Sequence, residues 1–163
     1  MSTQALGAAA AGTAILGGGG ATIAYAAGAF DPKAGEQKQE KSTYKTLAET
    51  DPFIFNKEYV GGDENAIKAL LEKKDDTSYK TTLKSTHWEK MEEKDILLGD
   101  KPTKTKASEF DNDSKNDEIS KYVSVWCQAV SAKELKAIPE SREEDHGKWE
   151  AFKFVCFKEK TGK

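Results

Sequence analysis

The stretch from Ala5 to Phe30 contains no charged side chain, although the rest of the chain is rich in charge. All 25 Lys and Arg residues and all 28 Asp and Glu residues follow it, beginning with Asp31. About 20 predominantly apolar residues are enough for a helix to cross a bilayer, and this stretch is longer. Because it consists mostly of Ala, Gly and Thr, its insertion is favourable by only a modest margin. We expect residues 1–30 to form a single membrane anchor.

Two other interpretations of residues 1–30 remain open. Ala27-Gly28-Ala29 has the small-x-small form of a signal-peptide cleavage site, but Met1–Gln4 lack the positive charge that a secretory signal carries. A disordered tail rich in Ala and Gly is the third interpretation. In the helical interpretation, small residues four positions apart form a candidate helix-contact face. Its members are Gly20, Ala24 and Gly28.

The charges after the anchor and the cysteines give opposite indications of orientation. Four lysines follow the anchor closely and no basic residue precedes it, so the positive-inside rule places the large domain in the cytoplasm. They are Lys33, Lys38, Lys41 and Lys45. In an exported domain Cys127 and Cys156 are expected to form one disulfide, worth about 3 to 4 kcal/mol. In a cytoplasmic domain they would be two buried thiols.

The remainder divides into a polar stalk, residues 31–45, and one small soluble domain, residues 46–163. Charged residues make up 33% of the whole chain against about 25% in an average protein, so we expect a thin core. The net charge of −3 is spread over mixed signs, and Arg142 is the one arginine. This composition argues against nucleic acid as a partner.

Apolar periodicity predicts a mainly α domain. Asp63 is a good N-cap for a helix to about Lys74, and residues 117–130 show the strongest helical spacing. A strand is the minority interpretation of that second segment, because it also alternates. The last segment, Trp149–Phe157, suits a helix slightly better than a strand, and a short C-terminal strand stays open. The expected core residues are Ile67, Leu70, Leu71, Leu83, Trp88, Met91, Ile119, Tyr122, Val123, Trp126, Val130, Phe152 and Val155.

The other segments give weaker indications. Tyr79, Leu83, His87 and Met91 lie four apart, as on one helix face, while Thr86 with Glu89 would instead start a shorter helix. Residues 103–115 read as a polar loop and residues 141–148 as a charged connection. Ser131 with Glu134 predicts a further short helix that ends at Pro139.

No arrangement of residues points to catalysis, to a cofactor or to a metal. A nucleophile needs an activating base, and the one candidate pair is Cys127 with His146. The group Glu143–His146 contains carboxylates and an imidazole, yet such a run is typical of a solvated turn. Asp111 begins a stretch like a calcium loop, but Asn116 replaces the required glycine and Tyr122 the bidentate glutamate. We therefore assign no catalytic, cofactor-binding or metal-binding residue.

The layout of the whole chain resembles short paralogous membrane and surface proteins of hemotropic mycoplasmas. The features that carry the resemblance are the small-residue apolar N-terminus, the Lys-rich body, Trp126-Cys127 and the late pair Trp149 and Cys156. The resemblance implies a wall-less parasite, membrane attachment and a surface-exposed domain that varies antigenically. It implies no known activity, and it favours an outward orientation.

These observations predict a non-enzymatic, single-pass protein of the cell membrane whose soluble domain is extracellular. Its expected partners are the lipid bilayer and a host protein, and an antigenic role is a further expectation. The first alternative is a scaffold that faces the cytoplasm on the same anchor. The second is an enzyme that uses Cys127 or the Glu143–His146 group.

Overall fold

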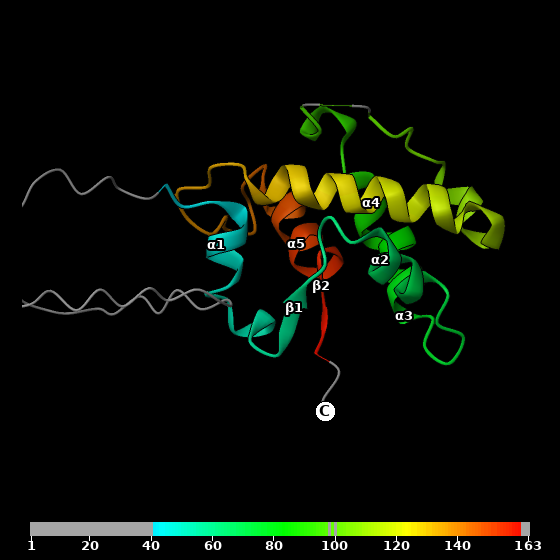
Figure 1. Cartoon of the computed structure of the whole chain (residues 1–163). Helices are drawn as coiled ribbons and strands as arrows, with labels where there is room; N and C mark the ends of the chain where they lie inside the picture. Colours follow the sequence, from blue (N-terminus) through cyan, green and yellow to red (C-terminus); the bar gives the residue numbers. More distant parts are fainter. Residues whose placement is uncertain (1–40, 98, 100, 161–163) are drawn as a thin grey trace, which may run out of the picture. The chain divides into compact units, whose positions relative to one another are not determined.

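Helix α4 (Asn116–Ser131) is the central element of the fold in a computed structural model, which describes residues 41–160 apart from 98 and 100. Its apolar residues recur at three- and four-residue spacing, so they form one buried face. That face contains Ile119, Tyr122, Val123, Trp126, Cys127 and Val130. Figure 1 shows α4 running across α2 and α5, which both pack against it. The helix predicted for residues 117–130 is confirmed, and the strand interpretation is wrong.

The described residues are mainly helical, as predicted. The α-helices are α1 (Tyr44–Ala48), α2 (Glu64–Leu71), α3 (Ser78–Thr82), α4 and α5 (His146–Val155), and the strands are β1 (Lys57–Tyr59) and β2 (Phe157–Glu159). Single 3-10 turns are η1 (Pro52–Ile54), η3 (Trp88–Lys90), η4 (Glu93–Asp95), η5 (Ala107–Asp111) and η6 (Asp113–Lys115), and η2 (Leu83–His87) is a π turn. Among the described residues, no helix combines the length and apolar character needed to cross a membrane.

The predicted anchor, residues 1–30, lies outside the described residues. The same holds for its candidate contact face, Gly20, Ala24 and Gly28. Both therefore remain predictions.

The boundary between stalk and domain lies earlier than predicted. Thr43 caps α1 through its side chain, and Tyr44 is only 3% exposed. The amide of Leu135 donates to the carbonyl of Ser42, so this segment is bonded to the residues that follow α4. The predicted stalk, residues 31–45, was extended too far because Tyr44 is a single apolar residue among polar ones.

Helix α2 begins where the sequence predicts. The side chain of Asp63 accepts a hydrogen bond from the amide of Ala66, at 2.9 Å. The helix ends at Leu71 rather than at Lys74, because residues 72–76 contain no apolar side chain that a further turn could bury.

The next segment follows neither of the two predicted patterns. It is α3, then the π turn η2, then the 3-10 turn η3. The wider π turn adds a residue, so His87 and Trp88 both reach the interior at neighbouring positions. Thr86 lies inside this turn and starts no helix. Trp88 and Met91 are buried, as both patterns predicted.

Residues 103–115 are not simply a polar loop. They contain η5 and η6, and Phe110 is 1% exposed because its ring packs edge-on against Trp88, with centroids 4.8 Å apart. The indole of Trp88 donates to the carbonyl of Thr105 at 2.9 Å. One apolar residue and one hydrogen bond thus hold this segment on the domain.

Two predictions on the C-terminal side are wrong. Ser131 is the last residue of α4 and its hydroxyl donates back to the carbonyl of Gln128, so it does not cap a following helix. Glu134 instead forms an isolated bridge with Thr43. Helix α5 begins at His146, so the predicted charged connection, residues 141–148, ends in helix.

Two short strands from distant parts of the sequence form a small antiparallel sheet. β2 follows α5 directly and pairs antiparallel with β1, with Tyr59 opposite Phe157 and Lys57 opposite Glu159. The helix preferred for Trp149–Phe157 is confirmed as far as Val155, and the short C-terminal strand that stayed open is present as Phe157–Glu159. The partner strand was not predicted, because three residues such as Lys57–Tyr59 are too short to show alternation.

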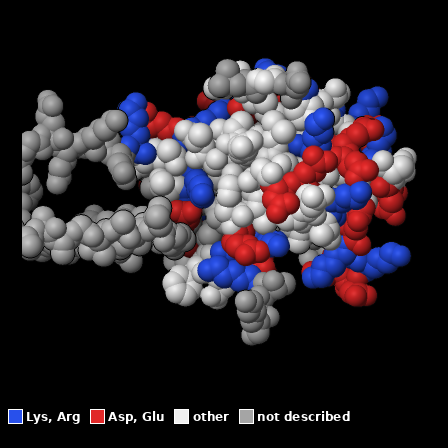
Figure 2. All heavy atoms as spheres, viewed as in Figure 1, with Lys and Arg blue, Asp and Glu red and all other residues white. Residues whose placement is uncertain are grey.

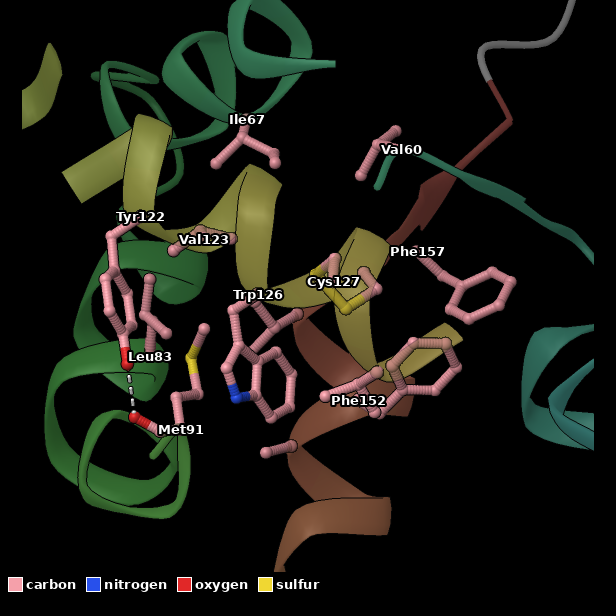
Figure 3. Close-up of a cluster of buried hydrophobic side chains, with 14 of the residues drawn as sticks. Val60, Ile67, Leu83, Met91, Tyr122, Val123, Trp126, Cys127, Phe152 and Phe157 are labelled. Atoms are coloured by element: carbon pink, nitrogen blue, oxygen red, sulfur yellow. Dashed lines mark hydrogen bonds between the residues drawn. A yellow bond between two sulfur atoms is a disulfide. The ribbon is translucent and has the colours of Figure 1, made fainter. Parts of the chain in front are cut away.

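The core is assembled from residues far apart in sequence. Figure 3 shows Trp126 of α4 near Phe152 of α5 and Met91, and Tyr122 donating to the carbonyl of Met91, at 2.8 Å. All predicted core residues are buried except Leu70, which is partly buried. Apolar residues that the sequence did not assign to the core but that are buried include Tyr44, Ile54, Val60, Ile96, Phe110, Trp149, Ala151 and Phe157.

One disulfide crosses this core. Cys127 of α4 is bonded to Cys156, the C-cap of α5, with the two Cα atoms 5.6 Å apart. Both residues are fully buried. Figure 3 shows the disulfide at Cys127 among side chains of the core. The predicted pairing is confirmed, and it joins the central helix to the start of β2.

We predict that loss of the disulfide destabilises the domain strongly. For a sequence separation of 29, loop closure in the unfolded chain corresponds to about 3 to 4 kcal/mol. Chemical denaturation of the natural protein with and without reductant measures this loss. The double variant Cys127→Ala/Cys156→Ala is the matched control, because reductant should leave its midpoint unchanged. Equal midpoints for the oxidised and reduced natural protein would contradict the prediction.

We also predict that stability falls as the pH drops below 6.5. Burial lowers the pKa of His87 below its ordinary value near 6.5, an effect that Glu150 partly offsets. The unfolded chain therefore binds this proton more readily, so the stabilisation is complete above pH 6.5 and is lost between there and the lower pKa of the folded state. Urea midpoints of His87→Gln between pH 7 and pH 5 should show a smaller slope than those of the natural protein. If the variant and the natural protein showed the same slope of urea midpoint against pH, the loss of stability at low pH would come from groups other than His87.

Candidate functional site

A groove beside β2 is the best-formed candidate for a binding site. It has a volume of ≈ 420 Å³ and is bounded by β2 on one side and by α2 and α3 on the other. In Figure 1, β2 lies between β1 and these two helices. We call it the β2 groove. Its apolar lining comes from Ala66, Ala69, Leu70, Tyr79, Phe154 and Phe157.

The apolar surface of the β2 groove follows from the local sequence of α2. Ala66, Ala69 and Leu70 lie on the side of the helix next to its buried face, where Ile67 and Leu71 meet α4. Because two of the three are alanines, α2 presents little bulk toward β2. This leaves a hollow rather than a packed contact.

A stack of aromatic rings forms the opposite end of the groove. The ring of Phe154 lies between Tyr79 and His87, with centroids at 5.7 and 4.8 Å. The hydroxyl of Tyr79 donates to the carbonyl of Val155 at 2.9 Å, which ties α3 to the end of α5. Burial raises the pKa of Tyr79, so the hydroxyl keeps its proton and remains a donor.

The side of β2 that faces away from β1 carries free backbone groups. The amide of Val60 donates to Cys156 and that of Lys160 to Asn56, so even-numbered residues carry the ladder bonds. The amides and carbonyls of Phe157 and Glu159 therefore point away from β1. None of these four groups has a hydrogen-bond partner in the part of the chain that the structure describes.

The charged residues on the rim of the groove are mostly paired. Lys57 lies 3.6 Å from Glu159, and Lys73 lies 3.2 Å from Asp76. Lys158 is paired with Glu58 outside the groove, at 2.9 Å. Each of the three rim lysines, Lys57, Lys73 and Lys158, thus has a carboxylate partner.

The candidate nucleophile Cys127 has no free thiol in this fold. Cys127 is bonded to Cys156 and has no thiol, and the Nδ1 atom of His146 lies 3.1 Å from the carbonyl of Pro139. The Cys127/His146 dyad is therefore wrong.

Two side chains of the Glu143–His146 group make local contacts within the described residues. Glu143 accepts a hydrogen bond from the amide of Glu140 at 2.8 Å, and Asp145 lies 3.5 Å from Lys148. Within the described residues, no set of three or more His, Cys, Asp or Glu side chains is arranged to hold a metal ion. In the stretch that begins like a calcium loop, Asp111 pairs with Lys84 at 2.8 Å.

A buried carboxylate that the sequence did not single out holds the middle of the domain. Asp95 is 1% exposed and accepts from Lys133 at 2.6 Å and from the indole of Trp126 at 3.3 Å. Lys148 lies 3.0 Å from the same carboxylate. Burial alone would raise the pKa of Asp95, but the two lysines hold it below its ordinary value. The cluster is satisfied internally and offers no open position to a ligand.

Charges of both signs are interspersed over the surface in view. Figure 2 shows Lys and Arg beside Asp and Glu around a central area without charge. Close ion pairs are common in the described residues, for example Lys80 with Asp113 at 2.9 Å and Lys115 with Glu118 at 2.7 Å. On this face no continuous basic stripe is seen.

Comparison of the chain with protein-family models, with curated proteins and with solved structures finds no match. The resemblance to hemotropic mycoplasma proteins therefore remains a prediction. Any role of the β2 groove has to be argued from its own residues.

We predict that Tyr79→Phe destabilises the domain by about 0.5 to 1.5 kcal/mol, the net contribution of one hydrogen bond. The change removes only the hydroxyl that binds the carbonyl of Val155 and keeps the stack on Phe154. Urea denaturation of both proteins measures the difference. Tyr44→Phe is the matched control, because the hydroxyl of Tyr44 has no hydrogen bond to the described residues; equal losses in the two variants would contradict the assignment.

Proposed function

We propose that the chain is a non-enzymatic surface protein, held in the cell membrane by residues 1–30, whose domain lies outside the cell and contacts a host component. The disulfide Cys127–Cys156 is the observation that carries this proposal. Disulfides persist in oxidising compartments and are rare in the cytosol, where thiols are kept reduced. A core built around a disulfide therefore supports an exported domain.

Three further features support the same proposal. The uncharged stretch Ala5–Phe30 is long enough to span a bilayer and precedes the domain in sequence. The disulfide occupies Cys127, which was one of the two candidate groups of the enzyme alternative. The resemblance to surface proteins of hemotropic mycoplasmas adds the expectation of antigenic variation.

A scaffold that faces the cytoplasm is the second candidate. Lys33, Lys38, Lys41 and Lys45 follow the anchor with no basic residue before it, and this favours an inward domain. Two of these lysines belong to the folded domain, where Lys41 pairs with Glu134 at 3.0 Å and Lys45 with Glu49 at 3.9 Å.

Labelling of intact cells with a membrane-impermeant amine reagent tests the orientation. Both cysteines are buried, whereas lysines such as Lys74, Lys101 and Lys136 are exposed on the domain. We expect peptide mapping to find these lysines modified without lysis. Modification of the same lysines only after lysis would overturn the proposal and favour the cytoplasmic scaffold.

The state of the cysteines provides an independent check on the same cells. Acid quenching followed by alkylation in denaturant should find Cys127 and Cys156 unmodified unless a reductant is added first. Free thiols at both positions would contradict an exported domain. A cytoplasmic protein of the same cells is the control for lysis and for oxidation during handling.

A further inference from the structure

We propose that the β2 groove binds an extended segment of another polypeptide, which adds to β2 as a third strand. The inference deepens the proposed function, on which its biological meaning rests, by naming the kind of partner that the domain contacts. It stands on the geometry of the groove itself, so it can be tested without reference to the orientation of the protein in a membrane.

The open edge of β2 determines the class of ligand. Phe157 and Glu159 each direct one amide and one carbonyl away from β1, toward the side on which α2 and α3 bound the groove. Such a row of alternating donors and acceptors matches the backbone of an extended peptide. A lipid chain or an aromatic compound would leave all four groups without partners.

The apolar wall of α2 supplies a place for the side chains of such a peptide. Alternate residues of a third strand point to the same face of the sheet. On one face they would lie against Ala69 and Leu70, and Leu70 is the one predicted core residue that remains partly exposed. Small or branched apolar side chains suit the volume of ≈ 420 Å³.

The position of Lys158 adds a preference for one acidic residue. Lys158 is the middle residue of β2, lines the groove and has Glu58 opposite it on β1. Opposite charges on directly facing residues of neighbouring strands stabilise the pair. We therefore expect an acidic side chain on the peptide opposite Lys158, flanked by apolar residues.

A second copy of the chain does not fit as the occupant. If the β2 strands of two copies paired symmetrically, the combined sheet would have the order β1-β2-β2-β1. The β1 strand of the second copy would then lie beyond its β2, as the fourth strand. That place is occupied by α2 and α3, which bound the groove on this side. The groove admits a single strand and excludes a sheet.

Selection of short random peptides displayed on phage against the full chain in detergent micelles tests the proposal. We expect enriched peptides with apolar residues at alternate positions and one acidic residue. The decisive variant is Glu159→Pro, because residue 159 directs its amide to the open edge and carries no ladder bond to β1. This variant should weaken binding of an enriched peptide about tenfold, as expected from one lost hydrogen bond and a blocked edge.

Glu159→Thr is the matched control, since it also removes the carboxylate that pairs with Lys57 but keeps the amide. It should bind the peptide almost as tightly as the natural protein. If Glu159→Pro fails to fold, Leu70→Glu replaces it by placing a charge on the apolar wall. Absence of enriched peptides, equal binding by Glu159→Pro and the natural protein, or equal weakening by Glu159→Thr would each overturn the proposal.

The two proposals fail in distinguishable ways. If the exposed lysines were labelled only after lysis, and Glu159→Pro weakened peptide binding, the groove would stand as a peptide site and the surface location would be rejected. Labelling on intact cells without edge-dependent binding would reject the groove and leave the surface location in place.

Discussion

Burial of one face of α4 is the constraint on which the rest of the domain depends. A chain with this many charged side chains has few apolar residues to bury, and α4 concentrates them on one continuous stripe. The other helices are short, so on their own they would be marginal in water. Each gains stability by packing on α4 or on an element that packs on it. The disulfide between α4 and the end of α5 adds stability to a domain that has few apolar residues to bury.

The sequence predicted the elements whose signal is local and continuous. The α4 stripe repeats over several turns, and the Asp63 cap stands directly before its helix, so both were recognisable. Phe110 was missed as core because one apolar residue in a polar stretch shows no period. The wrong helix after Ser131 arose because a Ser and a Glu three apart satisfy the capping-box pattern even where no apolar face follows.

The groove could not have been predicted from the sequence. Its walls come from α2, α3 and the end of the chain, which lie far apart in sequence and meet only because both α2 and α5 pack against α4. Strand β1 could not be predicted from the sequence either, because Lys57–Tyr59 pairs with Phe157–Glu159, about a hundred residues later. By contrast the pairing of the two cysteines was expected for an exported domain, because the chain contains only Cys127 and Cys156.

Four aromatic side chains of the domain donate to backbone carbonyls rather than to side chains. Tyr59 binds Cys127, Tyr79 binds Val155, Trp88 binds Thr105 and Tyr122 binds Met91. A carbonyl is the same group whichever residue bears it, so these anchors do not depend on the side chain at the accepting position. Exposed side chains in the segments so held can therefore change without loss of these four hydrogen bonds. The path of each segment over the core is fixed by its main chain and by the buried aromatic donor.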